Sequence, residues 1–207
     1  MISFQKRFLF VHIPKTGGNS IQTVLRDYSE DEVVARHDRQ DGVERFAVRN
    51  PKYNLKKHSK LAEYSDALGR EQFSNLYKFT VVRNPWDRMV SFYFTPGRGK
   101  SWDAQEFEKI IRETKGVADF LRLEKDDVDP FSNVDRIVRF ERLEEDFRAV
   151  CEHLAIPLAP LPKYNRSERE HYSKYYDERS RKIVNERFAD EIEAFGYSFE
   201  SAIKVSQ

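Results

Sequence analysis

The sequence predicts an α/β fold in which a central parallel sheet is flanked by helices. Apolar segments at residues 8–13 and 77–83 each lead directly into a stretch with helical spacing, and residues 134–140 repeat this pattern later in the chain. Strands that alternate with helices favour parallel pairing, because each helix supplies the crossover between neighbouring strands.

Length and charge limit the class of protein. The chain has 207 residues, and its 36 Lys and Arg against 35 Asp and Glu give a formal net charge of +1. This length is typical of one large domain, so a single domain over residues 1–207 is predicted. Near neutrality excludes a globally basic protein that coats nucleic acid, and no nucleic-acid partner is expected.

Cysteine usage and the N-terminal segment bear on localisation. Cys151 is the single cysteine, which excludes an intramolecular disulfide framework and favours a reducing compartment. The apolar run FLFV near the N-terminus is too short for a signal-peptide core or a membrane span. We therefore expect a cytoplasmic protein without a transmembrane segment, and its oligomeric state stays open.

The elements of the first part of the chain follow from apolar spacing. The first strand, residues 8–13, is short and apolar and ends at a proline. The helix after it is predicted from side chains on one face, Ile21, Val24, Leu25 and Tyr28. Residues 30–57 are polar and irregular, which predicts a loop-rich excursion. A short helix over residues 61–68 follows, with Ser59 as its N-cap and Gly69 as its stop.

The later elements repeat the pattern of a strand followed by a helix. The strand at residues 77–83 contains the β-branched and aromatic run KFTVV, and Asn84 can cap the helix that follows it. Residues 134–140 are the third predicted strand. The remaining helices are predicted at residues 101–125, 143–154 and 179–195.

The segment HIPKTGGNS lies between the first strand and its helix, where α/β proteins commonly hold anions. Gly17 and Gly18 would let the backbone approach a phosphate closely. Thr16 and Ser20 supply hydroxyls, and Lys15 supplies a point charge. The lysine precedes the glycines, so this is not a Walker A loop. A tight turn with a surface lysine is the alternative, but the Lys, Thr and Ser around the glycine pair favour a phosphate site.

The second strand-to-helix junction also carries polar residues. Arg83 ends the strand, and Ser91 lies eight residues on, two turns into the predicted helix. An arginine at the carboxyl end of a strand, together with a helical hydroxyl, would suit a second phosphate. Between them, Trp86 is expected to be a core residue, and pairing with a nearby carboxylate is one interpretation of Arg88.

The two motifs FVHIPKTGGNS and FTVVRNPWDRMVSFYF resemble the sulfotransferases that use 3′-phosphoadenosine 5′-phosphosulfate (PAPS), in particular the carbohydrate-type branch. The KKHS stretch and the closing pattern KYNRSERxHYxxYYD are similar to soluble bacterial members. This resemblance implies a P-loop-like domain that transfers a sulfuryl group from PAPS to a hydroxyl of a saccharide or another small molecule. Asn19 departs from the Thr or Ser of many relatives and lacks the hydroxyl that those residues carry.

The resemblance also implies roles for individual residues. Lys15 would stabilise the bridging oxygen as the bond to the sulfuryl group breaks, and no metal is required. The donor would be bound through Lys15, Thr16, Gly17, Gly18, Asn19, Ser20, Arg83, Ser91, Asn165, Arg166 and Ser167. The general base would be His58, which stands in KKHS just before a predicted helix. His12 beside the phosphate loop competes for this role, and His171 is the third candidate.

Two other functions are considered beside the sulfotransferase. One is a P-loop-like nucleotide-dependent kinase, and the other is a binding module that holds a nucleotide or a sulfated glycan without chemistry. The sequence lacks a Walker A motif and an evident Mg²⁺-binding aspartate after an apolar strand, which counts against the kinase. Lys15, Arg83, Ser91 and a candidate base occur together, which counts against a module without chemistry.

Overall fold

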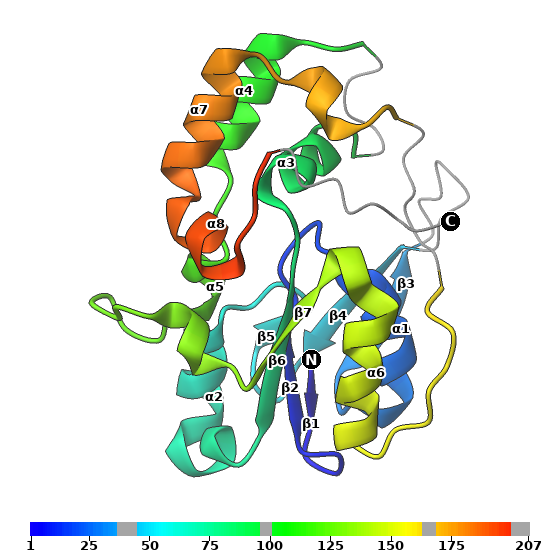
Figure 1. The fold of residues 1–207 in the computed structure, drawn as a ribbon. Coiled ribbons are helices and arrows are strands. Elements are labelled where there is room, and N and C mark those ends of the chain that lie inside the picture. Colours follow the sequence, from blue (N-terminus) through cyan, green and yellow to red (C-terminus); the bar gives the residue numbers. More distant parts are fainter. Residues whose placement is uncertain (37–44, 96–100, 163–168, 200–207) are drawn as a thin grey trace. The chain divides into compact units, whose positions relative to one another are not determined.

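The computed structural model describes residues 1–36, 45–95, 101–162 and 169–199 (Figure 1). The chain forms two compact units, and each unit is assembled from two separate stretches. The first unit consists of Met1–Val82 and Val117–Asn165, and the second of Arg83–Gly116 and Arg166–Gln207. Because no single cut in the sequence separates the units, the single-domain organisation stays a prediction.

The first unit contains a four-stranded sheet in the order β1, β2, β6, β7. The strands are β1 (Ile2–Ser3), β2 (Phe8–Val11), β6 (Tyr77–Val82) and β7 (Arg136–Arg139). β6 pairs in parallel with both β2 and β7, and β1 pairs antiparallel with β2. The α/β fold with a central parallel sheet flanked by helices is confirmed, and all three predicted strands are present.

Helices cover both faces of this sheet (Figure 1). On one face lie α1 (Gly18–Leu25) and α6 (Leu143–His153), and on the other lies α2 (Leu61–Ser74), which contacts α5 (Ala118–Leu121). Burial on both faces explains why β2 and β6 are apolar along almost their whole length instead of alternating.

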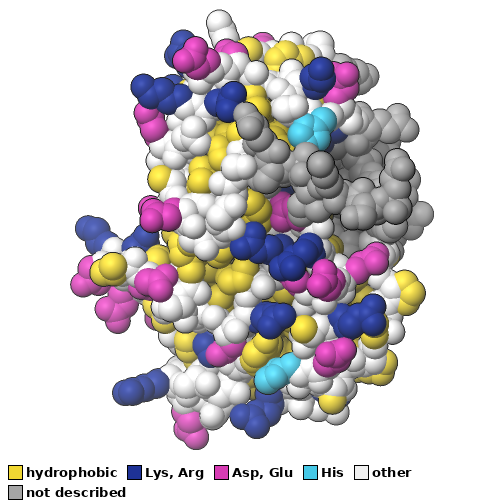
Figure 2. All heavy atoms as spheres, in the orientation of Figure 1, with side chains coloured by type: hydrophobic (Ala, Val, Ile, Leu, Met, Phe, Trp, Pro, Cys, Tyr) yellow, Lys and Arg dark blue, Asp and Glu magenta, His cyan; other side chains and the backbone are white. Residues whose placement is uncertain are grey.

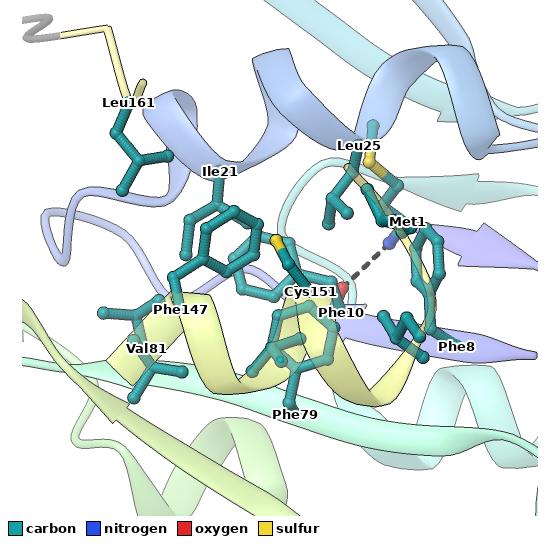
Figure 3. Packing of buried hydrophobic residues seen from close by; sticks show 14 of the residues in the cluster. Met1, Phe8, Phe10, Ile21, Leu25, Phe79, Val81, Phe147, Cys151 and Leu161 are labelled. Atoms are coloured by element: carbon teal, nitrogen blue, oxygen red, sulfur yellow. Dashed lines mark hydrogen bonds between the residues drawn. The ribbon is translucent and has the colours of Figure 1, made fainter. Parts of the chain in front are cut away.

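The core of the first unit is packed between the sheet and helices α1 and α6 (Figure 3). Its buried side chains include Phe8, Phe10, Ile21, Leu25, Phe79, Val81, Phe147, Val150 and Cys151. The rings of Phe10 and Phe79 stack with their centroids 5.0 Å apart. At the edge of this cluster, the amino group of Met1 donates to the Phe10 carbonyl over 2.9 Å and to the Tyr64 hydroxyl over 2.7 Å.

A second, three-stranded sheet occupies the region for which a loop was predicted. It consists of β3 (Glu32–Arg36), β4 (Arg45–Asn50) and β5 (Leu55–Lys56), paired antiparallel. The loop prediction for residues 30–57 is therefore wrong. In β4, Phe46 and Val48 are buried while Arg49 between Val48 and Asn50 is exposed, so the strand buries one face. The overall polarity of residues 30–57 favoured a loop, although the alternation of buried and exposed residues in β4 is typical of a half-buried strand.

Helix α2 differs in detail from its prediction. Its N-cap is Lys60, not Ser59, and the Glu63 carboxylate accepts from the Lys60 backbone N–H over 2.6 Å. Gly69 has a left-handed φ of 71°, but it interrupts the helix instead of ending it, because helical turns resume up to Ser74. The carboxylate three residues into the helix thus supplies the capping group that the serine was expected to provide.

The second unit is helical. It consists of α3 (Pro85–Tyr93), α4 (Ala104–Glu113), α7 (Glu178–Arg187) and α8 (Ala189–Phe195). The side chain of Asn84 accepts from the backbone N–H groups of Trp86 and Asp87, which confirms the predicted cap of α3. The helix predicted at residues 179–195 is present as α7 and α8, which meet at Phe188.

The core of the second unit is rich in aromatic rings, and Trp86 is buried in it as expected. Arg88 is fully buried and pairs with Glu191 over 3.8 Å, which confirms its predicted carboxylate partner. Its guanidinium also donates to the Lys115 carbonyl over 2.9 Å. Short 3₁₀ helices are also present in both units. Those of the first unit are η1 (Arg26–Tyr28), η2 (Pro130–Asn133) and η3 (Phe140–Arg142), and that of the second is η4 (Tyr172–Tyr175).

Charged side chains of both signs are interspersed on the face shown in Figure 2. This mixture agrees with the formal net charge of +1. Total charge therefore does not identify an anion site on this protein, and the local arrangement of side chains must be considered instead.

Truncation of the core tests the packing of α6 against the sheet. Phe147 is buried at 1% exposure, so Phe147→Ala leaves a cavity beside the sheet. We expect it to lower the free energy of unfolding by about 3–5 kcal/mol, measured by urea denaturation. Val128 is 97% exposed, and we expect Val128→Ala to change stability by less than about 0.5 kcal/mol. Equal effects of the two substitutions would contradict this packing.

Candidate active site

The loop between β2 and α1 is held in shape by its own backbone. Lys15 has a φ of 68° and Gly17 a φ of 86°, so two of three successive residues are left-handed. Between them, the Thr16 hydroxyl is buried and donates to the Ile13 carbonyl over 2.8 Å. Left-handed residues of this kind occur in backbone turns that direct N–H groups toward an anion.

Packing alone already requires both glycines of the loop. A Cβ at Gly18 would overlap the imidazole ring of His12, and a Cβ at Gly17 would lie 2.8 Å from Cδ2 of Phe140. The predicted reason for the pair was close approach of the backbone to a phosphate. The structure adds a second reason, because the glycines also let His12 and Phe140 pack beneath the loop.

The N-terminus of α1 follows the loop directly. In the part of the chain that the structure describes, no side chain caps this eight-residue helix, so its first N–H groups lie at the positive end of the helix dipole without a side-chain acceptor. The Ser20 hydroxyl donates to the Pro162 carbonyl over 2.6 Å. Ser20 thus ties the helix to the segment that precedes residue 163.

His12 is buried at 3% exposure at the carboxyl end of β2. Its Nδ1 donates to Oε1 of Gln22 in α1 over 2.9 Å, and its ring stacks on Phe10. Burial holds the pKa of His12 well below its ordinary value of 6.5, and the neighbouring His58 and Lys57 lower it further. The ring is therefore neutral near pH 7 and packs as a core residue.

His58 lies between β5 and α2 and is exposed to solvent. Its Nδ1 donates to the backbone carbonyl of His12 over 2.9 Å, and the two rings lie 4.5 Å apart. This bond places the ring proton on Nδ1, so Nε2 carries the lone pair. Partial desolvation lowers the pKa of His58, and the charges of Lys57 and Lys15 lower it further. The fold therefore places His58 beside His12 and close enough to Lys15 for the lysine charge to affect it.

The second unit contains a separate cluster of charged side chains, Arg83, Asp87 and Arg169. Nε and Nη2 of Arg83 donate to one oxygen of Asp87 over 2.8 and 2.6 Å. Nη2 of Arg169 donates to the other carboxylate oxygen over 2.5 Å. Burial alone favours the neutral acid, but Arg83 and Arg169 hold the pKa of Asp87 below its usual value. The carboxylate is thus ionised and bridges two guanidinium groups.

Ser91 and His171 also lie in the second unit. Ser91 is half-buried on α3 and follows Asp87 by four residues, which places both side chains on one face of the helix. His171 is exposed, and its Nδ1 is 2.9 Å from the Ser173 hydroxyl at the start of η4. The predicted donor ligands Asn165, Arg166 and Ser167 lie outside the described residues.

A family model described as the sulfotransferase family matches residues 1–125, which is more than half of the chain. The chain belongs to the sulfotransferase family. It is therefore a transferase of sulfuryl groups that requires a sulfate donor as cosubstrate and a small-molecule acceptor. No curated protein and no solved structure matches this sulfotransferase.

The matched part of the sulfotransferase contains both predicted motifs and His58. Arg169 lies beyond it and was not singled out from the sequence, because its contact with Asp87 joins residues 82 positions apart. The only sequence signal was its place in the closing pattern KYNRSERxHYxxYYD. That pattern gives no indication that the arginine reaches helix α3.

Two further properties of the sulfotransferase concern metals and membranes. Among the residues described here, His, Cys, Asp and Glu side chains form no group of three or more that could hold a metal ion. None of the helices within the described ranges combines the length and apolar character needed to cross a membrane.

Substitution of Gly18 tests the packing of the loop. Ala ordinarily stabilises a helix relative to Gly by about 1 kcal/mol. At position 18 we expect the opposite sign, a loss of about 1–3 kcal/mol in unfolding free energy, because the added methyl group overlaps the His12 ring. In a His12→Ala background the added cost of Gly18→Ala should largely disappear. A stabilising Gly18→Ala in the wild-type background would contradict this packing.

The burial of His12 predicts a pH dependence of stability. Because its folded pKa lies below 6.5, the unfolded chain binds more protons, and stability is lost as the pH falls below about 6.5. We expect this loss in urea denaturation at pH 7.5 and 5.5. His12→Gln should reduce it, whereas His171→Gln, at an exposed position, should leave it unchanged. An unchanged pH dependence in His12→Gln would contradict the assignment.

Proposed function

We propose that this sulfotransferase uses PAPS as its donor and transfers the sulfuryl group to a hydroxyl of a saccharide. The observation that carries the proposal is the hydrogen bond from Nδ1 of His58 to the His12 carbonyl. It holds a candidate base against the segment between β2 and α1, which carries Lys15 and leads into helix α1. A base, a cation and backbone donors are what sulfuryl transfer to a hydroxyl requires.

The proposed binding of the donor is divided between two groups of residues. The loop suits a 5′-phosphosulfate, because Lys15 and the first N–H groups of α1 both favour an anion. The hydroxyl of Thr16 is engaged with the Ile13 carbonyl, so its contribution is to hold the turn, and its backbone N–H is the donor we assign to the anion. Arg83 and Ser91 are proposed to bind the 3′-phosphate, following the resemblance of the second motif.

The proposed chemistry assigns one role to each side chain. PAPS supplies an activated sulfuryl group attached to a phosphate leaving group. Lys15 stabilises the negative charge that develops on the bridging oxygen as the bond to sulfur breaks. Nε2 of His58 accepts the proton of the acceptor hydroxyl as that oxygen bonds to sulfur. The Nδ1–H bond to the His12 carbonyl then stabilises the resulting imidazolium.

The pKa of His58 fits this role. A base must be neutral before the reaction, and partial desolvation with Lys57 and Lys15 lowers the pKa of His58 from 6.5. His12 is less suited, since its ring is buried and its Nδ1 is bonded to Gln22. We therefore assign the base to His58 and a packing role to the His12 ring.

The acceptor and the localisation are also part of the proposal. The resemblance to the carbohydrate-type branch supports a saccharide hydroxyl. A cytoplasmic location is supported by the single cysteine, Cys151, which is free and buried in the core.

Ligand binding tests the choice of donor. In thermal-shift experiments we expect 3′-phosphoadenosine 5′-phosphate to raise the melting temperature more than 5′-AMP or ATP does, because only this ligand carries the 3′-phosphate that Arg83 and Ser91 would bind. Equal or absent stabilisation by all three ligands would refute PAPS as donor.

Kinetics of His58 and Lys15 variants test the chemistry. We expect His58→Gln to lower kcat by about 10²–10⁴ while affinity for 3′-phosphoadenosine 5′-phosphate stays nearly unchanged. Lys15→Met should lower kcat by about 10²–10³, because charge on the bridging oxygen is no longer stabilised. Rates are measured with radiolabelled PAPS and a panel of glycans. His153→Gln, at the last residue of helix α6, is the matched control and should keep wild-type activity. Full activity of His58→Gln would contradict the assignment of His58 as the base.

A further inference from the structure

We propose that Asp87 is a positioning residue that holds Arg83 and Arg169 together as one paired cation site for a phosphate of the nucleotide donor. This inference rests on the proposed function and adds two residues to it. Arg169 becomes a second phosphate ligand beside Arg83. Asp87 acts through both arginines without contacting the donor.

Arg83, Asp87 and Arg169 form one hydrogen-bonded cluster, with the carboxylate between the two guanidinium groups. Each oxygen of the Asp87 carboxylate accepts from a different arginine, and Arg83 directs two N–H groups to the same oxygen. Arginine is planar, so a contact through two N–H groups fixes the orientation of the whole guanidinium. The carboxylate thereby sets the directions of two guanidinium groups that come from the two separate stretches of the second unit.

Burial and charge distinguish this cluster from a surface ion pair. The side chains of Arg83 and Arg169 are each 11% exposed and that of Asp87 is 19% exposed. Two guanidinium groups and one carboxylate together carry one net positive charge. A positive sum of these three charges favours an anionic ligand.

Asp87 is itself rigidly placed. It lies in the first turn of α3, where Asn84 accepts from its backbone N–H and from that of Trp86. The hydroxyl of Tyr176 donates to the Trp86 carbonyl over 2.8 Å and further fixes this turn. A carboxylate at this position also interacts favourably with the helix dipole. The cluster is therefore already ordered before a ligand binds.

The sign of one substitution separates a positioning role from simple electrostatics. Asp87→Asn removes a negative charge close to the proposed anion, so Coulomb attraction alone would make phosphate bind more tightly. If Asp87 orients the two guanidinium groups, its loss weakens binding, because the arginines must be ordered again when the ligand arrives.

The experiment measures the Kd of the full-length protein for 3′-phosphoadenosine 5′-phosphate and for 5′-AMP by calorimetry. We expect Asp87→Asn to raise the first Kd about tenfold or more and the second less than about twofold. Glu108→Gln is the matched control. Glu108 also contacts two arginines in this unit, Arg179 over 3.1 Å and Arg112 over 3.7 Å, but their side chains are 72% and 53% exposed. We expect wild-type affinities for this control.

Further variants keep the test decisive. If Asp87→Asn does not fold, Asp87→Glu retains the charge at the helix start but displaces the carboxylate, and it should also weaken binding of the 3′-phosphorylated ligand. Arg169→Lys should show a partial loss, and Arg169→Gln a larger one. Unchanged or tighter binding in Asp87→Asn or Asp87→Glu, or wild-type affinity in Arg169→Gln, overturns the inference. Equal wild-type affinity for the two nucleotides would instead refute the proposed function.

Discussion

The buried imidazole of His12 connects three segments of the first unit. Its ring packs against Gly18 at the start of α1, its Nδ1 bonds to Gln22 in the same helix, and its backbone carbonyl accepts from Nδ1 of His58. Because the ring is buried and neutral near pH 7, these contacts hold without a charge to be solvated. The start of helix α1 and the position of the candidate base therefore both depend on one core histidine.

In the second unit a buried carboxylate has the corresponding role. Asp87 orders Arg83 and Arg169, while the capped first turn of α3 orders Asp87. In both units a group that does not face the ligand sets the direction of the groups proposed to bind or react. Burying such a group costs free energy when the protein folds. Because the binding groups are then already ordered, ligand binding no longer bears the cost of ordering them.

Local pattern was sufficient to predict much of the fold. Strands β2 and β6 are short apolar runs, and Asn84 caps α3 as its residue type indicates. The sheet of β3, β4 and β5 was missed because the overall polarity of residues 30–57 outweighed the short alternation of buried and exposed residues in β4. The sequence could suggest His58 and Arg83 as site residues but not the carbonyl that holds His58 or the contact of Arg169. Those contacts join residues 46 and 82 positions apart, and no local pattern encodes them.

The fold presents a neutral His58 with its proton on Nδ1 and its lone pair on Nε2. Nitrogen NMR of ¹⁵N-histidine-labelled protein at pH 7 measures this directly, with the His58 signals assigned by their loss in His58→Gln. We expect a protonated Nδ1 and an unprotonated Nε2. A proton on Nε2 alone, or an imidazolium at pH 7, would contradict it.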